Sequence, residues 1–145
     1  MVHGHFRRFR TAEVWLAGSE LTVVATGPKC SLGLVNVPLA AASPAELPGL
    51  AAVVTCESFL RPVRSYGSCR LGSGWGVEYY FSLVAVWCVG YDELAAALTV
   101  EFSGRLLETH WQKTDMIGPM WAGVPASGRL RCRVRDGETP NPVGA

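Results

Sequence analysis

The sequence predicts an α+β domain built mainly on an antiparallel β-sheet, with about six to eight strands and one helix near residues 92–102. Most segments alternate apolar with polar residues and are separated by turns rich in glycine and proline, which is typical of strands. These segments follow one another as hairpins more than as repeated strand, helix and strand units, which favours antiparallel pairing. A β-sandwich is the alternative architecture, because it also joins short strands by tight turns.

The 145-residue chain fits one domain, expected at residues 12–136 between a flexible basic arm (1–11) and a disordered tail (137–145). Hydrophobic residues make up 49% of the chain and charged residues 17%, as in a folded globule. The first residues lack the apolar stretch of a signal peptide, and the uncharged run 79–91 is too short for a membrane span. With five cysteines and no C-x-x-C pair, we expect a soluble protein with reduced thiols in the cytoplasm or nucleus.

The first half of the chain predicts strands joined by irregular connections. Residues 12–27 alternate on both sides of Gly18 and Ser19, which predicts a hairpin that turns there. Residues 32–37 are predicted as one short strand, because the prolines that follow them disfavour a longer one. Residues 52–59 are predicted as the next strand, followed by a turn region punctuated by glycines.

Residues 75–89 are rich in aromatic and β-branched side chains on both faces, which predicts a central strand covered on both sides. Asp92 is expected to cap the helix at 92–102, whose apolar residues recur at helical spacing. Strand and helix should share the core, so five residues are expected to be largely buried: Val84, Val86, Trp87, Leu98 and Val134. Alternation returns at 105–115 and at 129–136, which are predicted as the last two strands with a glycine and proline loop between them.

The last predicted strand carries a row of arginines that alternate with apolar residues: Arg129, Arg131, Arg133 and Arg135. Residues two apart on a strand lie on one face, roughly 6.6 Å apart, so this row could contact every second phosphate of a nucleic acid. The alternative is a solvated strand face, whose charges also keep sheet edges from pairing with other chains.

The N-terminal arm adds a second basic group, in which Arg7, Arg8 and Arg10 are interleaved with Phe6 and Phe9. Guanidinium groups could contact phosphates there, and the aromatic rings could stack on bases. The alternative is a terminus whose phenylalanines dock on the domain. No recognised RNA-binding motif accompanies either basic group.

These features predict a small non-enzymatic protein that binds RNA or DNA, or has a regulatory role, through phosphate contacts of its arginines. The alternative is a protein-interaction or assembly module whose apolar loop residues Met116, Met120 and Trp121 contact a partner. That partner could be another protein or a second copy of the chain in a homo-oligomer. A compact chain with few charges and many aromatic residues is also similar in style to small viral accessory proteins.

Three kinds of chemistry carry weaker signals. His3 and His5 are too few to form a zinc site by themselves, so no metal is expected. Cys69 could act as a nucleophile with His110 as base and Asp115 as its orienting group, although this combination matches no family signature. No glycine-rich loop opens a helix, so no nucleotide or other cofactor is expected.

Overall fold

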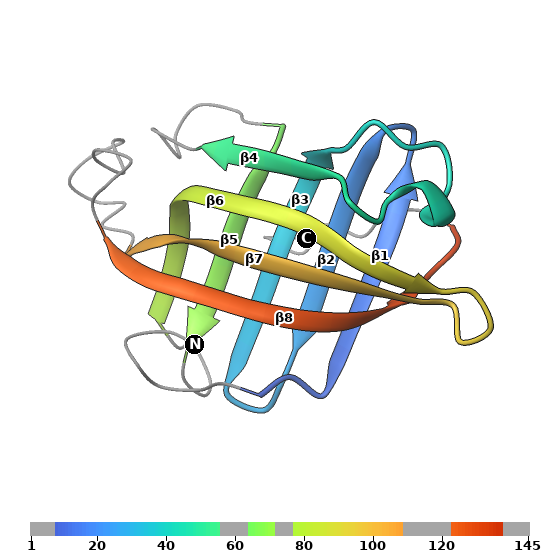
Figure 1. The fold of residues 1–145 in the computed structure, drawn as a ribbon. Coiled ribbons are helices and arrows are strands. Elements are labelled where there is room, and N and C mark those ends of the chain that lie inside the picture. The colour runs from blue at the N-terminus through green and yellow to red at the C-terminus, as the bar shows by residue number, and fades with distance from the viewer. Residues whose placement is uncertain (1–7, 56–63, 72–76, 109–122, 138–145) are drawn as a thin grey trace.

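A computed structural model describes residues 8–55, 64–71, 77–108 and 123–137, and strands dominate these residues (Figure 1). They form eight strands and one short 3-10 helix, which follow one another along the chain as β1 (Thr11–Ala17), β2 (Glu20–Thr26), β3 (Cys30–Pro38), η1 (Pro44–Glu46), β4 (Ala51–Thr55), β5 (Tyr66–Leu71), β6 (Val77–Asp92), β7 (Ala97–Glu108) and β8 (Val124–Val134).

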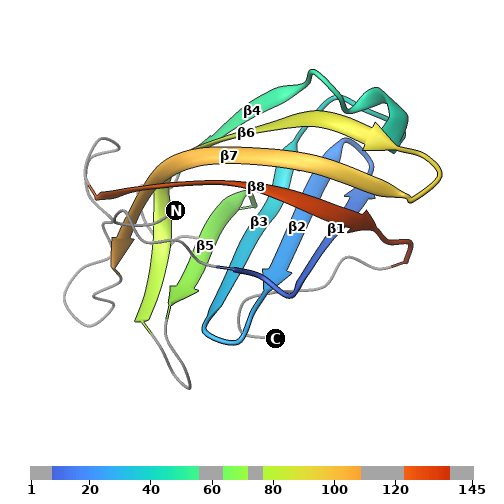
Figure 2. The ribbon, with the colours of Figure 1, turned by 60° about the horizontal axis from the view of Figure 1, so that its bottom comes forward.

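The sheet closes on itself. Neighbouring strands run in the order β6, β5, β3, β2, β1, β8 and β7, and β7 pairs again with β6. Strand β4 lies outside this ring and pairs with the second half of β6, along the edge that β5 uses in the first half. In Figures 1 and 2, β4, β6, β7 and β8 form a layer that crosses over β5, β3, β2 and β1.

The predicted α+β fold is therefore wrong, because the described residues form a seven-stranded barrel with an eighth strand attached. The β-sandwich alternative is also wrong, since the two crossing layers belong to one continuous sheet rather than to two separate ones.

The helix predicted at 92–102 does not form. Residues 93–96 are a turn and β7 begins at Ala97, so β6 and β7 are the two arms of one long hairpin. Asp92 still caps a turn, where its side chain accepts a hydrogen bond from the Ala95 backbone N–H at 3.2 Å. Leu94 is fully exposed, and from Leu98 onward alternate side chains face the core, which is the period of a strand. The described part of the chain has no helix long and apolar enough to cross a membrane.

Several predicted strands are confirmed. The first hairpin joins β1 and β2 through Gly18, whose φ of 61° lies in the left-handed region that glycine adopts without strain. The strand predicted at 32–37 lies within β3, and the run 75–89 largely coincides with β6. The arginine-rich strand begins earlier than expected, at Val124. The ends of the strands predicted at 52–59 and 105–115 lie outside the described residues.

Strand β6 is central in its pairing, but it is not covered on both faces. Val84 and Val86 are fully buried as predicted, and so is Leu98 on the neighbouring β7. Trp87 on the outer face of β6 is only half-buried, as is Val134 at the end of β8. A closed barrel has a single interior, so each of its strands keeps one face outside.

The barrel interior is filled by side chains around two phenylalanines. Phe81 on β6 and Phe102 on β7 meet edge to face, with ring centroids 6.0 Å apart. Gly67 on β5 and Gly104 on β7 leave room for the Phe81 ring, because a Cβ atom on them would lie 2.7 Å and 2.9 Å from it. Ring and glycines are therefore complementary in volume across three adjacent strands.

The segment before β1 belongs partly to the domain. The Arg10 backbone N–H donates to the Thr26 carbonyl at 2.7 Å, and the Cys30 thiol donates to the Arg8 carbonyl at 3.3 Å. Phe9 packs against the core, as in the docked alternative for this arm. Arg7 lies outside the described residues.

Candidate functional site

The arginine row lies on the outer face of the barrel. Arg129, Arg131 and Arg133 on β8 and Arg135 just beyond it are all exposed, while the intervening Leu130 and Cys132 are buried in the core. The alternation predicted for this strand is therefore confirmed.

Three of the four arginines are paired with carboxylates from other strands. Arg129 donates to Glu101 on β7, with its Nε at 2.6 Å from the carboxylate. Arg131 donates to Asp92 at the end of β6, at 3.2 Å. Arg135 forms an ion pair with Glu13 on β1, at 3.1 Å. Most of the row is thus engaged in cross-strand ion pairs.

These contacts stabilise the charged form of two carboxylates. The pKa of Glu101 is lowered by the hydrogen bond from Arg129, and by a further bond from the Trp87 indole N–H at 2.7 Å. The pKa of Asp92 is lowered chiefly by the Ala95 backbone N–H and then by Arg131. Asp92 is exposed, Glu101 is half-buried and both arginine partners are exposed, so solvent screens these pairs and they contribute little to stability.

The row also borders an edge of the sheet. Strand β8 pairs with β1 only at two positions, Glu13 with Arg133 and Val14 with Val134. From Val124 to Cys132, the side of β8 that faces away from β7 has no strand partner among the described residues. Charged side chains on such an edge hinder its pairing with other chains. This is the structural role that the ion-paired arginines fit directly.

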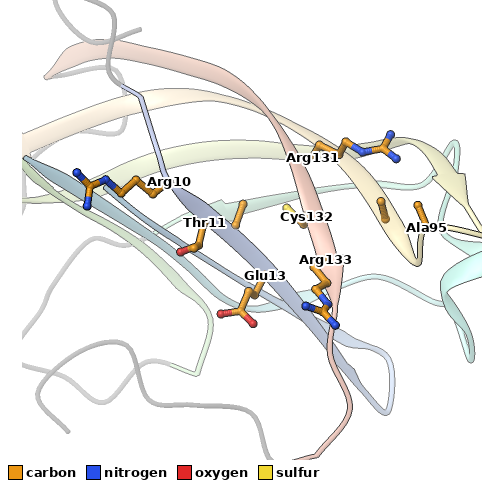
Figure 3. Close-up of a pocket in the computed structure, with 9 residues that line it drawn as sticks. Arg10, Thr11, Glu13, Ala95, Arg131, Cys132 and Arg133 are labelled. Carbon is orange, nitrogen blue, oxygen red and sulfur yellow. The ribbon is translucent and has the colours of Figure 1, made fainter. Parts of the chain in front are cut away.

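Arg133 differs from the rest of the row, because it has no ion pair within the described ranges. Together with Arg10, Glu13 and Arg131 it lines an open pocket of about 470 Å³ at the junction of β1 and β8 (Figure 3). Figure 3 shows Arg10 and Arg131 pointing away from each other across this pocket. The pocket therefore does not gather guanidinium groups around one anion.

The cysteine hypothesis loses its structural basis. Cys69 lies in β5 instead of an open glycine-rich turn, and only 5% of its surface is exposed. Its proposed partners His110 and Asp115 lie outside the described residues. Cys88 and Cys132 are core residues, and burial raises their pKa values to about 11 and about 12. A nucleophilic cysteine needs the opposite shift, toward the thiolate.

The remaining predicted sites are placed only in part. Among the described residues no three His, Cys, Asp or Glu side chains gather as a metal site would require. His3 and His5 lie outside these residues, and so do the loop residues Met116, Met120 and Trp121.

A surface that the sequence did not suggest lies over β4 and β6. The exposed side of β4 carries Ala51, Val53 and Thr55, which stand opposite Trp87, Ala85 and Leu83 of β6. We call these six residues the β4–β6 surface. Val53 is 61% exposed and none of the six is charged, so the surface is apolar apart from one threonine hydroxyl.

Strand β4 is also an edge strand. It pairs with β6 alone, and nothing else in the described ranges bonds to the backbone of its outer side. In contrast to β8, it has no charged residue. The only signal in the sequence was the short uncharged run AAVVT, which equally fits a buried strand.

No protein-family model matches the chain, and comparison with curated proteins and with solved structures found no match.

Proposed function

We propose that this protein is a non-enzymatic interaction or assembly module that binds another protein strand along β4 and the β4–β6 surface. The observation that carries the proposal is the contrast between two sheet edges. Two edges have no strand partner within the described ranges: that of β8 carries arginines on alternate residues, whereas that of β4 is uncharged and apolar. An uncharged open edge pairs readily with other strands unless a specific partner covers it.

The neighbouring side chains support the same function. Trp87 lies beside β4 on the outer face, and its indole N–H is already bonded to Glu101, so its ring can contact a partner without leaving a donor unpaired. Val89, further along β6, is 45% exposed. Cys88 and Cys132 are free thiols, which suits a module that acts in the cytoplasm or nucleus.

Quantitative capture with three baits tests this function: the parent chain, Val53→Lys, and Leu94→Lys as matched control. Both variants replace an exposed apolar residue with lysine, but only Val53 lies on β4. We expect at least one protein to be captured by the parent, either a different protein or an untagged copy of this chain. Its recovered amount should fall by about tenfold or more with Val53→Lys, because the lysine would be desolvated in the interface. Leu94→Lys should retain it.

Equal recovery of every bound protein by all three baits would contradict the proposal. Thermal unfolding of the two variants provides the folding control, and it should match the parent because both side chains are exposed.

Nucleic-acid binding is the second candidate, and it is favoured by two arginines at the junction of β1 and β8 that have no carboxylate partner among the described residues. Arg10 and Arg133 are exposed and have no ion pair within the described part of the chain. Exposed ion pairs are weak, so the rest of the row could also exchange carboxylates for phosphates. The protein would then be a regulator that binds the phosphate backbone of RNA or DNA.

The salt dependence of affinity for duplex DNA tests this candidate. If Arg10 and Arg133 each neutralise one phosphate, replacing both with glutamine should remove about 1.8 from the slope of log affinity against log salt, and the full row would contribute about −3.6. Arg129→Gln is the matched control and should change the slope less, because Glu101 already engages this guanidinium. Affinity should fall alike for all sequences. An unchanged slope in the double variant would reject the candidate.

A further inference from the structure

We infer that the partner of β4 is β4 of a second copy of this chain, paired antiparallel about a twofold axis at Val53. This inference rests on the proposed function and identifies its partner. It follows from the hydrogen-bonding phase of β4, from the symmetry of an antiparallel pair, and from the absence of charge on the β4–β6 surface.

Leu50, the residue before β4, shows which residues of the strand direct their backbone hydrogen bonds toward β6. The Cys88 backbone N–H donates to the Leu50 carbonyl at 3.0 Å, so Leu50 bonds toward β6. Bonding direction alternates along an antiparallel strand, so Ala52 and Val54 also bond toward β6. The backbone N–H and C=O groups of the three residues between and after them therefore face the free edge: Ala51, Val53 and Thr55.

These three residues form a self-complementary edge. In an antiparallel pair centred on Val53, this residue faces Val53 of the second copy, and Ala51 faces Thr55. Each facing pair exchanges two backbone hydrogen bonds, so the three pairs form about six. The three side chains all lie on the outer, exposed face, so pairing leaves the buried Val54 and the core unchanged.

Charge and length favour a second copy over an unrelated strand. The β4–β6 surface carries no charge that would select an acidic or basic partner, and none that would make identical copies repel each other. Among the described residues, Glu101 and Arg105 are the charged strand partners of this surface, and they lie on β7, across β6 from the edge that would pair. An identical five-residue strand uses every free bonding group, and twofold dimers are the commonest assemblies of identical chains.

Charge exchange at the axis tests both the partner and the register. The purified chain should be a dimer by sedimentation velocity and light scattering, and Val53→Lys and Val53→Glu should each weaken it at least about tenfold by placing like charges face to face. An equimolar mixture of these two variants should recover the dimer as a heterodimer. Leu94→Lys, which changes an exposed residue of the β6–β7 turn, should dimerise like the parent.

A second pair of variants tests the register without a charge at the axis. Ala51→Glu combined with Thr55→Lys places opposite charges across the twofold axis and should retain the dimer, whereas Ala51→Lys combined with Thr55→Lys should dissociate it. A parent that stays monomeric at every concentration overturns the inference. So does a dimer that none of these substitutions affects, or a charge mixture that fails to recover. If the parent is monomeric but captures a different protein, and Val53→Lys abolishes that capture, the proposed function stands and only the second copy as partner is rejected.

Discussion

Phe81→Ala is expected to lower the free energy of unfolding by about 3–5 kcal/mol, since it removes a large side chain from a close-packed interior. Phe81 is 1% exposed and is among the largest fully buried side chains of the barrel. Its ring packs edge to face on Phe102 and lies over Gly67 and Gly104, which have no side chains to fill the space that it would leave. Chemical denaturation followed by circular dichroism measures the loss.

Two controls separate this effect from a general sensitivity to substitution. Leu94→Ala removes a fully exposed side chain of similar character and should change stability by less than about 0.5 kcal/mol. The double variant Phe81→Ala with Phe102→Ala should lose about 0.5–1.5 kcal/mol less than the sum of the two single losses, because each single variant already removes the contact between the rings. A loss below 1 kcal/mol for Phe81→Ala, on the order of a surface change, would contradict the packing described for this ring.

Local patterns predicted most strands because alternation and turn residues act over short stretches of chain. The β1–β2 hairpin needed only Gly18 and the apolar residues around it. The error at 92–102 has the same local origin, since Leu94, Ala97 and Leu98 fit a helical period while Leu98, Val100 and Phe102 fit a strand period. Pairing of β7 with both β6 and β8 decided between the two periods.

The candidate sites depended on contacts between distant parts of the chain. Alternation placed the arginines of β8 on one outer face, but it could not show that Glu101 and Asp92, 28 and 39 residues away, would pair with Arg129 and Arg131. The exposed edge of β4 could not be predicted either, because AAVVT fits the centre of a sheet as well as its border. That edge has no strand partner in the described part of the chain because the ring closes without β4.

Gly104→Ala is expected to lower the free energy of unfolding by about 3 kcal/mol, at the upper end of the cost of overpacking a core. A Cβ atom at this position would lie 2.2 Å from the Leu83 carbonyl oxygen and 2.9 Å from the Val84 Cα atom, both in the backbone of β6. A side chain could rotate away from such a contact, but the β6 backbone is held by pairing with β4 and β7. The new methyl group must therefore push the β6–β7 hairpin apart where it helps close the barrel.

Gly90→Ala is the matched control for this substitution, because Gly90 lies in the same hairpin but a Cβ atom there would meet nothing within 4 Å. We expect it to change stability by less than about 0.5 kcal/mol. Urea denaturation of the two variants side by side measures the difference, with the slope of each transition showing whether the native state stays compact. Equal losses in the two variants would mean that Gly104 is not in close contact with β6, because its contacts with the Leu83 and Val84 backbone and with the Phe81 ring distinguish the two positions.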